Sequence, residues 1–362
     1  MARDNSASTT VVLAGGGTAG HIEPALAVGE VLRDNYGANV IALGTPKGLE
    51  TSIVPARGFT LELIDPVPVP RKQPLKLLAL PFKVIKSVGQ ARKAMKNAGA
   101  DVVFGTGGYV SASAYMAAAS LRLPIFVLES NALAGVANKL GVRLGGTGFN
   151  AVANSGMKGE VVGIPVRQSV GADDDGEKAR RGYATWNLDP EKKTILVTGG
   201  SQGAVSLNTA IEESIEQLTS AGYQVLHAYG RKNDAPEPHE NYVAVPYIDD
   251  MSAALAVADL VICRSGAMTV AENAAAGVPA IYVPLPHGNG EQGLNSKHLV
   301  EAGAARMIDD AALTADVLVE NVVEILSDEQ TYNKMRVALA DSGAGNVADT
   351  LARRVMDAAQ SK

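Results

Sequence analysis

Short apolar runs alternate with longer amphipathic segments along almost the whole chain. In the first half, four largely apolar runs are separated by segments with helical spacing, notably 24–33 and 111–120. Runs this short are typical of strands buried on both faces of a parallel sheet. The predicted strands lie at residues 11–14, 39–43, 101–104 and 125–128.

The same alternation starts again in the second half of the chain. Two such series predict an α/β fold built from two Rossmann-like domains, each with a parallel sheet between layers of helices. A chain of 362 residues also exceeds the size of one ordinary core. The second series of predicted strands lies at 194–197, 224–228, 242–245, 259–263 and 280–283.

We expect the domains to span 1–167 and 168–345. An extended piece at 163–166 and an acidic, polar stretch at 172–177 are typical of a surface connection between domains. Residues 346–362 are amphipathic and predict a C-terminal helix that can return to the N-terminal domain.

Glycine-rich loops follow three of the predicted strands. Gly15, Gly17 and Gly20 follow the first, the segment 105–109 follows the third, and the segment 199–204 opens the second half. Glycines let the backbone turn tightly, and the helix that follows offers free N–H groups to an anion. Such loops at strand ends predict binding sites of the nucleotide type.

Two alternatives apply to the first loop. Its Gly-x-Gly-x-x-Gly spacing also occurs in NAD-binding proteins, but these need an acidic residue at the end of the second strand. Here that strand ends in Ala42-Leu43-Gly44-Thr45-Pro46, without an acid. The other alternative is a turn that serves only helix–sheet packing.

Composition excludes several classes of protein. The net charge of −6 disfavours a nucleic-acid partner, and a single cysteine, Cys263, excludes a disulfide framework or a thiolate zinc site. Cys263 ends an apolar run and is expected to be a buried core residue. Residues 1–10 lack the apolar segment of a signal peptide, and no run is long enough for a spanning helix.

The segment 264–279 predicts a strand, a turn and a helix. Ser265 can cap the helix, and Gly277 can end it before Pro279. Glu272, two turns into that helix, can accept hydrogen bonds from the two hydroxyls of a ribose. The alternative is an ordinary solvated glutamate. The loop 284–295 gathers amide and acid groups that suit sugar hydroxyls.

Eight motifs follow one another along the chain. They are Gly-Gly-Thr-Ala-Gly-His at 16–21, Gly-Gly-Tyr-Val-Ser at 107–111, Glu-Ser-Asn at 129–131, Gly-Ile-Pro-Val-Arg at 163–167, Gly-Gly-Ser-Gln-Gly-Ala at 199–204, Tyr-Ile-Asp-Asp-Met at 247–251, the segment 264–279, and Glu-Gln at 291–292. In order and spacing the chain resembles the MurG family. The resemblance implies a GT-B fold whose two domains face a deep cleft, and inverting transfer of GlcNAc from UDP-GlcNAc to the C4 hydroxyl of the MurNAc of lipid I, giving lipid II.

The resemblance also implies roles for individual residues. The backbone of Ile248 holds the uracil, Glu272 the ribose, and Gln292 the GlcNAc hydroxyls. The diphosphate contacts Arg167, Ser201 and the turn Ala267, Met268 and Thr269. From the N-terminal half, Thr18, Ala19, Gly20 and Asn131 reach the sugar and the acceptor, while Gly107, Gly108 and Tyr109 lie on the acceptor side. Three departures from the family pattern are Ser130, Glu291 and a shortened, Gly-rich segment at 144–160.

The transfer needs a base and a means of stabilising the departing UDP. His21 is the first candidate base because imidazole titrates near neutral pH, although it can also serve a structural role between the loops. Glu129 is the second candidate. Arg167, the Ser201 loop and helix N-termini can stabilise UDP without a metal or other cofactor. No Asp-x-Asp pair of the kind that holds Mg²⁺ is present, since Asp249 and Asp250 are adjacent.

No acidic residue occurs in the window 66–100, which mixes eight Lys and Arg residues with leucine, isoleucine, valine and Phe82. Such a stretch predicts contact with an anionic membrane surface. The alternative is a helix whose apolar side packs on the sheet while its lysines are solvated. The polyprenyl-linked acceptor favours the membrane, and the resemblance implies a peripheral protein on the cytoplasmic side that meets other cell-wall synthesis and division proteins.

Three rival functions remain on sequence alone. A UDP-GlcNAc 2-epimerase or a glycosyltransferase with a soluble acceptor shares the fold and donor but does not need the basic window. A catalytically inactive scaffold for cell-wall assembly would not need His21, Asn131 and Glu272 together.

Overall fold

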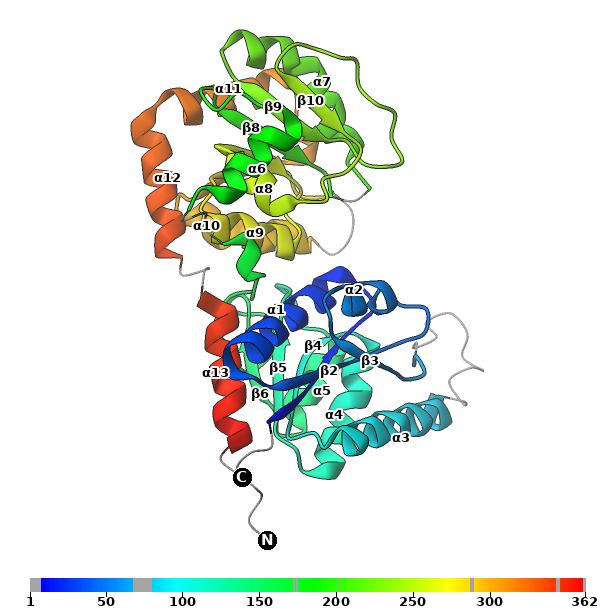
Figure 1. Cartoon of the computed structure of the whole chain (residues 1–362). Helices are drawn as coiled ribbons and strands as arrows, with labels where there is room; N and C mark the ends of the chain where they lie inside the picture. The colour runs from blue at the N-terminus through cyan, green and yellow to red at the C-terminus, as the bar shows by residue number, and fades with distance from the viewer. Residues whose placement is uncertain are drawn as a thin grey trace. The chain divides into compact units, whose positions relative to one another are not determined.

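The computed structural model describes residues 8–67, 80–171, 173, 175–200, 202–286, 290–342 and 346–360. The chain forms two compact units (Figure 1). Unit 1 comprises Met1–Arg167 with Asn346–Lys362, and unit 2 comprises Gln168–Gly345. The C-terminal segment therefore belongs to the same unit as the N-terminal half of the chain.

Unit 1 contains a seven-stranded, fully parallel sheet with the strand order β3-β2-β1-β4-β5-β6-β7. Its strands are β1 (Thr10–Gly15), β2 (Asn39–Gly44), β3 (Thr60–Leu63), β4 (Val102–Gly107), β5 (Ile125–Glu129), β6 (Thr147–Asn150) and β7 (Glu160–Val161). Its helices are α1 (Ala19–Tyr36), α2 (Glu50–Ala56), α3 (Leu80–Ala98), α4 (Tyr109–Leu121), α5 (Val136–Arg143) and α13 (Val347–Gln360).

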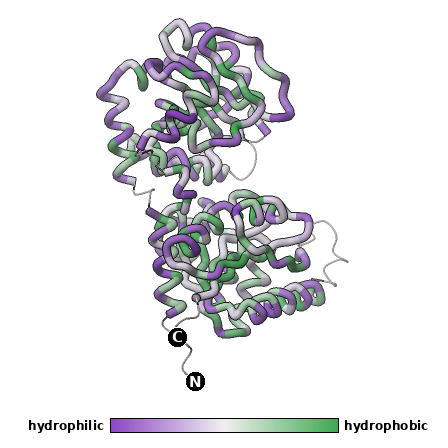
Figure 2. The backbone as a smooth tube through the Cα atoms, viewed as in Figure 1, coloured by the Kyte–Doolittle hydropathy of each residue, from purple (hydrophilic) through white to green (hydrophobic). Residues whose placement is uncertain are grey.

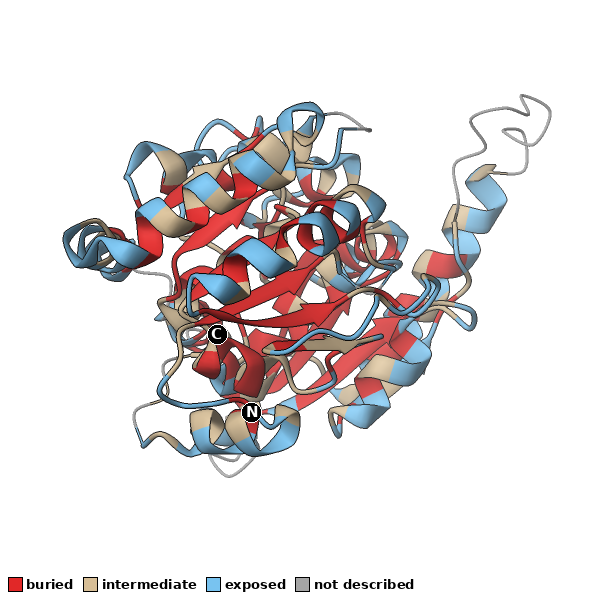
Figure 3. Cartoon of the chain, turned by 90° about the horizontal axis from the view of Figure 1, so that it is seen from above, coloured by how far each residue is buried: buried red, intermediate tan, exposed pale blue. Residues whose placement is uncertain are grey.

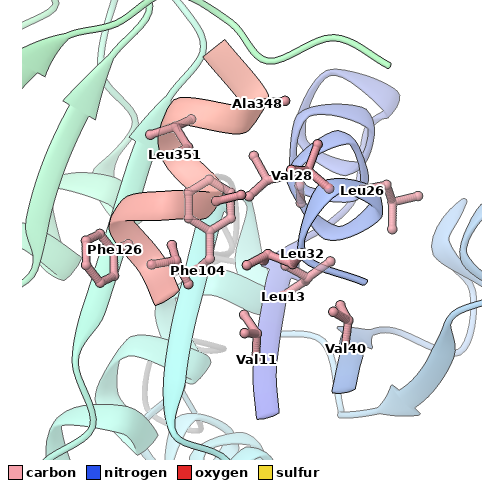
Figure 4. Packing of buried hydrophobic residues seen from close by; sticks show 14 of the residues in the cluster. Val11, Leu13, Leu26, Val28, Leu32, Val40, Phe104, Phe126, Ala348 and Leu351 are labelled. Atoms are coloured by element: carbon pink, nitrogen blue, oxygen red, sulfur yellow. The ribbon is translucent and has the colours of Figure 1, made fainter. Parts of the chain in front are cut away.

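Alternate residues of the central strands serve the two faces of this sheet. Val11 and Leu13 pack with α1 and α13, whereas Val12 and Ala14 pack with α3 and α4. This division follows from the two-residue period of a strand. Figure 4 shows Ala348 and Leu351 of α13 in the same cluster as Val28 of α1 and Phe104 of β4. Helix α13 therefore completes the core of unit 1.

Unit 2 repeats this plan with a six-stranded parallel sheet of order β10-β9-β8-β11-β12-β13. Its strands are β8 (Thr194–Thr198), β9 (Gln224–Ala228), β10 (Tyr242–Val245), β11 (Leu260–Cys263), β12 (Ala280–Tyr282) and β13 (Ala305–Met307). Its helices are η2 (Gln168–Val170), α6 (Glu177–Trp186), α7 (Val205–Ser220), α8 (Met251–Val257), α9 (Ala267–Ala276), α10 (Glu291–Glu301), η3 (Asp310–Ala312), α11 (Ala315–Ser327) and α12 (Glu329–Asp341).

The central strands are the apolar, buried part of both units. In Figure 2 the interior of each unit is largely hydrophobic, and in Figure 3 the central strands are buried while the surrounding helices carry exposed residues on their outward sides. Cys263, at the end of β11, is fully buried as predicted, and burial raises the pKa of its thiol to about 12. A thiol in that state is a core residue and not a nucleophile.

The predicted strands and helices are confirmed, with longer bounds in most cases. Four strands were not predicted, namely β3, β6, β7 and β13. In the acidic stretch, the Asp173 carboxylate accepts hydrogen bonds from the N–H groups of Lys178 and Ala179 at 3.1 and 2.8 Å. It therefore caps the start of α6. Residues 172 and 174 lie outside the described residues.

Each sheet reverses its strand order between two central strands. In unit 1 the reversal lies between β1 and β4, and in unit 2 between β8 and β11. Helices that leave such a pair diverge to opposite faces, so a crevice opens at the carboxyl ends of the strands. The glycine-rich loops follow β1, β4 and β8, and the segment 264–279 follows β11. The fold therefore places the predicted motifs at the two switch points.

Candidate functional site

The loops after β1 and β4 are in direct contact. The N–H of Gly16 donates a hydrogen bond to the carbonyl oxygen of Gly107 at 3.3 Å. A Cβ at Gly108 would lie 2.2 Å from the carbonyl oxygen of Gly16, and Gly108 has a φ of 87°. Only glycine allows this approach. The acceptor-side motif and the first glycine-rich loop thus form one surface, beside which Tyr109 is 53% exposed.

His21 lies in the first turn of α1, against this pair of loops. Its Nδ1 is 3.1 Å from the hydroxyl of Thr18, and its carbonyl oxygen accepts a hydrogen bond from the Thr106 hydroxyl at 2.5 Å. A Cβ at Gly107 would lie 3.0 Å from the Nε2 atom of His21. Among the described residues, Nε2 has no hydrogen-bond partner. The ring is therefore oriented through Nδ1.

Glu129 is buried beneath the loop that carries Asn131. Its side chain is 1% exposed, and its two oxygens accept four hydrogen bonds. Oε1 accepts from the backbone N–H and the side-chain amide of Asn131 at 2.9 and 3.2 Å. Oε2 accepts from the N–H of Gly135 at 2.9 Å and from the amide of Asn138 at 2.8 Å. These contacts make Glu129 the anchor that orients Asn131.

Asn138 was not singled out by the sequence. This buried side chain joins β4, β5 and α5, because its amide also donates to the carbonyl oxygens of Leu128 at 3.1 Å and Thr106 at 3.4 Å. Its Oδ1 accepts from the Tyr115 hydroxyl at 3.1 Å. Asn138 lies in a short amphipathic helix, and nothing in the sequence around it indicates that its side chain connects β4, β5 and α5.

Arg167 is the last residue of unit 1 and lies beside a carboxylate. Its Nε is 3.9 Å from Oε2 of Glu23, which is bound more closely by Arg57 at 2.6 Å. Arg57 also contacts Glu30 at 2.6 Å. The side chain of Arg167 is 32% exposed.

In unit 2, the loop after β8 is held from the side by Asn233. Its amide donates to the carbonyl oxygens of Gln202 at 2.9 Å and Tyr229 at 2.7 Å. A Cβ at Gly200 would meet nothing within 4 Å, so the loop is open at that point. Ser201, the predicted phosphate ligand, lies outside the described residues.

The helix of the segment 264–279 is α9. Its C-terminal end agrees with the prediction, and its N-terminal end differs from it. Gly277 ends it in the left-handed conformation (φ 70°), which confirms that assignment. Ser265 does not cap it. The N-cap is Gly266, and the buried Ser265 hydroxyl has no partner among the described residues. The backbone of Ala267, Met268 and Thr269 therefore forms the first turn of α9, with no side-chain cap on its N–H groups.

Arg264 joins four segments at the carboxyl end of the second sheet. Its guanidinium donates to the carbonyl oxygens of Val283 and Pro284 at 3.1 and 3.2 Å, to the carboxylate of Asp310 at 2.5 Å, and to the hydroxyl of Ser206 at 2.8 Å. The side chain is only 12% exposed. Arg264 therefore fixes the loop after β11 against α7, the end of β12 and η3.

The other predicted donor residues of unit 2 lie on or next to α8, α9 and α10. Glu272 is half-buried on α9, and Ile248 is buried just before α8. Gln292, in the first turn of α10, accepts a hydrogen bond from the N–H of Leu285 at 2.9 Å through Oε1. Asn295 donates to the carbonyl oxygen of Ser265 at 3.1 Å and so ties α10 to α9. Residues 287–289 lie outside the described residues.

Asp250 has a structural role. It is the N-cap of α8, where its Oδ1 accepts from the N–H of Ala253 at 3.1 Å. Burial would raise the pKa of Asp250, but the hydrogen bonds from Arg181, Ser252 and the Ala253 N–H lower it to about 2. Across the described part of the chain, no group of three or more His, Cys, Asp or Glu side chains could hold a metal ion.

The shortened segment at 144–160 is held by its own hydrogen bonds. The Ser155 hydroxyl donates to Asn150 Oδ1 at 2.6 Å, and the Asn150 amide donates to the carbonyl oxygen of Met157 at 3.2 Å. The carbonyl oxygen of Ser155 accepts from the N–H of Ala134 at 2.8 Å. The segment therefore supports the loop that follows Asn131.

Helix α3 carries the described half of the basic window. Its buried side consists of Ser87, Ala91, Ala94 and Met95, so packing uses its small residues. Phe82 and Ile85 are 76% and 69% exposed. Lys86 pairs with Asp65 at 2.6 Å, and this ammonium group holds the pKa of that carboxyl below its usual range. Residues 68–79 of the window lie outside the described residues, and no described helix is long and apolar enough to cross a membrane.

Comparisons with known proteins agree with this arrangement. Residues 11–145 match the glycosyltransferase family 28 N-terminal domain, and residues 194–351 match the glycosyltransferase family 28 C-terminal domain. The crystal structure of Acinetobacter baumannii MurG superimposes with a TM-score of 0.75 at 29% identity, covering 97% of this chain and 100% of that chain. Fold and matches together define a GT-B glycosyltransferase of family 28.

Two relatives are similar over nearly their whole length. Both carry the name UDP-N-acetylglucosamine--N-acetylmuramyl-(pentapeptide) pyrophosphoryl-undecaprenol N-acetylglucosamine transferase. The one from Corynebacterium glutamicum (strain R) is 61% identical over 342 residues, covering 94% of this chain and 96% of the relative. The one from Corynebacterium diphtheriae is 61% identical over 343 residues, covering 94% and 95%. The chain belongs to the MurG family.

Proposed function

We propose that this enzyme transfers GlcNAc from UDP-GlcNAc to the C4 hydroxyl of the MurNAc of lipid I, giving lipid II for peptidoglycan synthesis. The observation that carries the proposal is the 61% identity, over 94% of the chain, with relatives named for this reaction. The position of the matching motifs at both switch points supports it.

The donor binds mainly to unit 2 in this proposal. The first turn of α9, at Ala267, Met268 and Thr269, offers backbone N–H groups to the diphosphate, and a helix N-terminus favours an anion. Ser201 and Arg167 complete the diphosphate contacts. Glu272 binds the ribose hydroxyls, the Ile248 backbone the uracil, and Gln292 the GlcNAc.

The acceptor step uses unit 1. The C4 hydroxyl attacks the anomeric carbon while the bond from that carbon to the UDP oxygen breaks, so the configuration inverts. His21 takes the hydroxyl proton through Nε2, and Thr18 holds the opposite nitrogen. The contacts favour His21 over Glu129, because all four hydrogen bonds of the buried Glu129 carboxylate are internal.

Arg167, the Ser201 loop and the N-terminus of α9 stabilise the negative charge on the departing UDP. Such fixed donors act where charge develops, and they are worth most in a site that excludes water. We propose that turnover needs no metal or other cofactor.

We also propose that α3 lies on the cytoplasmic face of the membrane. The exposed Phe82 and Ile85 next to Lys83 support this, because apolar side chains enter the headgroup region while lysines meet anionic lipid. This placement brings the enzyme to its polyprenyl-linked acceptor and to other cell-wall synthesis and division proteins.

Release of UDP from UDP-GlcNAc tests the function. Purified enzyme should release UDP when a lipid I analogue is present, and release should stay near background without it. A truncated muramyl acceptor without the diphospholipid serves as the specificity control. Equal release with or without any acceptor would contradict the proposal.

A further inference from the structure

A buried glutamate lies directly beneath the first glycine-rich loop. Glu50 begins α2, yet it is 0% exposed, whereas glutamates are almost never fully buried without a partner. Its Oε1 accepts a hydrogen bond from the N–H of Gly17 at 3.0 Å. Its Oε2 is buried and has no hydrogen-bond partner among the described residues. Burial of such a group costs stability, so its position calls for a functional reason.

Three glycines make the space that Glu50 occupies. A Cβ at Gly16 would lie 2.3 Å from Oε1 of Glu50, and a Cβ at Gly48 would lie 1.6 Å from Oε2. A Cβ at Gly44 would lie 2.8 Å from the Cβ of Glu50. Gly44 and Gly48 are not among the glycines with positive φ, so backbone conformation does not require glycine there. The side chain of Glu50 leaves no room for a Cβ at either position, together with Leu61 at Gly44 and Thr45 at Gly48.

The Glu50 carboxylate changes what the first glycine-rich loop can bind. A glycine-rich loop before a helix ordinarily offers its N–H groups to phosphate oxygens. Here the N–H of Gly17 is used by Glu50, and the N–H of Gly16 is used by the carbonyl oxygen of Gly107. A phosphate would meet acceptor oxygens where it needs donors. A Cβ at Gly17 would itself meet nothing within 4 Å, so the loop is restricted by the use of its N–H groups and not by crowding at that residue.

The same contact determines where the acceptor-side residues lie. Gly17 has a φ of 90° and directly precedes Thr18, whose carbonyl oxygen accepts from the N–H of His21 at 3.1 Å. Thr18 also meets the His21 ring through its hydroxyl. Anchoring the N–H of Gly17 therefore fixes the turn that presents both side chains.

We propose that Glu50 is a positioning residue that fills the anion-binding side of the first glycine-rich loop, sets the Thr18–His21 turn, and leaves diphosphate binding to the loop of unit 2. The expected effect on kcat rests on the proposed function, since it concerns the base of the acceptor step. The expected effect on the conformation of the Thr18–His21 turn does not rest on that function.

Two substitutions remove the contact in different ways. Glu50→Ala deletes the carboxyl group, and Gly48→Ala displaces it while leaving it in the chain. Each should lower kcat by about tenfold to a hundredfold, as small misplacements near the chemistry do. The UDP affinity in calorimetry should stay unchanged, because the proposed uracil, ribose and diphosphate contacts do not include the Thr18–His21 turn. Glu50→Gln should keep most activity, because its amide oxygen can still accept from Gly17. Glu62→Ala, an exposed glutamate on β3, is the matched control.

The double variant Glu50→Ala/Gly48→Ala should lose no more activity than either single variant. Each substitution removes the same contact, the hydrogen bond from the N–H of Gly17 to Glu50. Hydrogen exchange in a peptide covering 15–22 should accelerate in both Ala variants and not in Glu50→Gln or Glu62→Ala. This readout does not need turnover, so it holds even for an enzyme that fails to make lipid II. Parent-like exchange and kcat in either Ala variant, or a loss in Glu50→Gln equal to that in Glu50→Ala, would overturn the inference.

Discussion

Single residues differ in whether their polar atoms are already used inside the fold. Glu129 and His21 both lie at the carboxyl end of the first sheet. The carboxylate of Glu129 accepts four internal hydrogen bonds, whereas Nε2 of His21 has no partner among the described residues. A general base must reach its substrate proton with a free atom, so these contacts favour His21, the first candidate from the sequence, over Glu129.

Replacing His21 with Ala should lower kcat by about 10²–10⁴, the usual contribution of a general base. UDP-GlcNAc binding should barely change, because His21 is not among the proposed donor contacts. Stopped-time assays of lipid II formation give kcat, and calorimetry gives donor affinity. His239→Ala, an exposed histidine of unit 2, is the control. A fall of less than about tenfold would assign the proton to water or to Glu129.

Replacing Glu272 with Ala should weaken UDP-GlcNAc binding by about 1.5–3 kcal/mol, the value of hydrogen bonds to a charged group. The ribose hydroxyls lose their acceptor, while the diphosphate contacts remain. Glu216→Ala, an exposed glutamate on α7, should leave the affinity as it is. Isothermal calorimetry on both variants measures the affinity for UDP-GlcNAc. An unaltered affinity in Glu272→Ala would contradict the assignment of Glu272 to the ribose.

At the scale of elements, α3 separates its packing side from an exposed side that mixes lysines with large apolar groups. Phe82→Ser/Ile85→Ser should reduce sedimentation with vesicles of anionic lipid, because these side chains are 76% and 69% exposed. Binding should also weaken with salt, since exposed charges are screened within about 10 Å at 0.1 M. Val337→Ser on α12, another exposed apolar residue, is the control. Parent-like vesicle binding by the double variant would show that α3 is not the anchor.

Strands β9 and β10 share a buried polar cluster with α7. His227 is fully buried, with Nδ1 at 2.7 Å from the Tyr242 hydroxyl and Nε2 at 3.1 Å from Asn208 Oδ1. Desolvation lowers the pKa of His227 from 6.5 to about 4. The unfolded chain therefore binds a proton between those values that the folded chain does not, so stability falls as pH drops from about 6.5 to about 4.

Urea unfolding at pH 7 and pH 5 measures this loss. Trp186, the one tryptophan of the chain, lies on α6 of unit 2, so its fluorescence reports on the unit that holds His227. His227→Gln keeps a hydrogen-bonding side chain without the titration and should reduce the pH dependence of the unfolding free energy. Equal pH dependence in parent and variant would mean that the pKa of His227 is the same in the folded and the unfolded chain, which contradicts its lowering by burial.

For the whole molecule, the sequence was sufficient for the two parallel sheets because their central strands are uninterrupted apolar runs. It was insufficient for four strands at or next to a sheet edge, although the edge strand β10 was predicted. Strand β3 is mostly exposed, β7 has two exposed residues, β13 is interrupted by Arg306, and the short β6 contains a glycine. Exposed or very short edge strands lack the apolar run on which the prediction relied.

The residues of the candidate site also divide into those that the sequence predicted and those that it did not. Glycine-rich loops were visible because glycine marks a strand end, but Glu50, Asn138 and Arg264 act through partners far along the chain. The hydrogen bond from Gly17 to Glu50 spans 33 positions, and that from Arg264 to Asp310 spans 46. No local pattern encodes such contacts. The Ser265 cap failed for a local reason, since α9 begins one residue later than that cap requires.

The product of the reaction tests the central claim most directly. Enzyme, UDP-GlcNAc and a lipid I analogue should give a product that carries one GlcNAc β-linked to O4 of MurNAc, identified by mass spectrometry and NMR. The β configuration follows from inversion of the α-linked donor. An α-linked product, a GlcNAc at another hydroxyl, or conversion of UDP-GlcNAc to its 2-epimer without transfer would contradict the account.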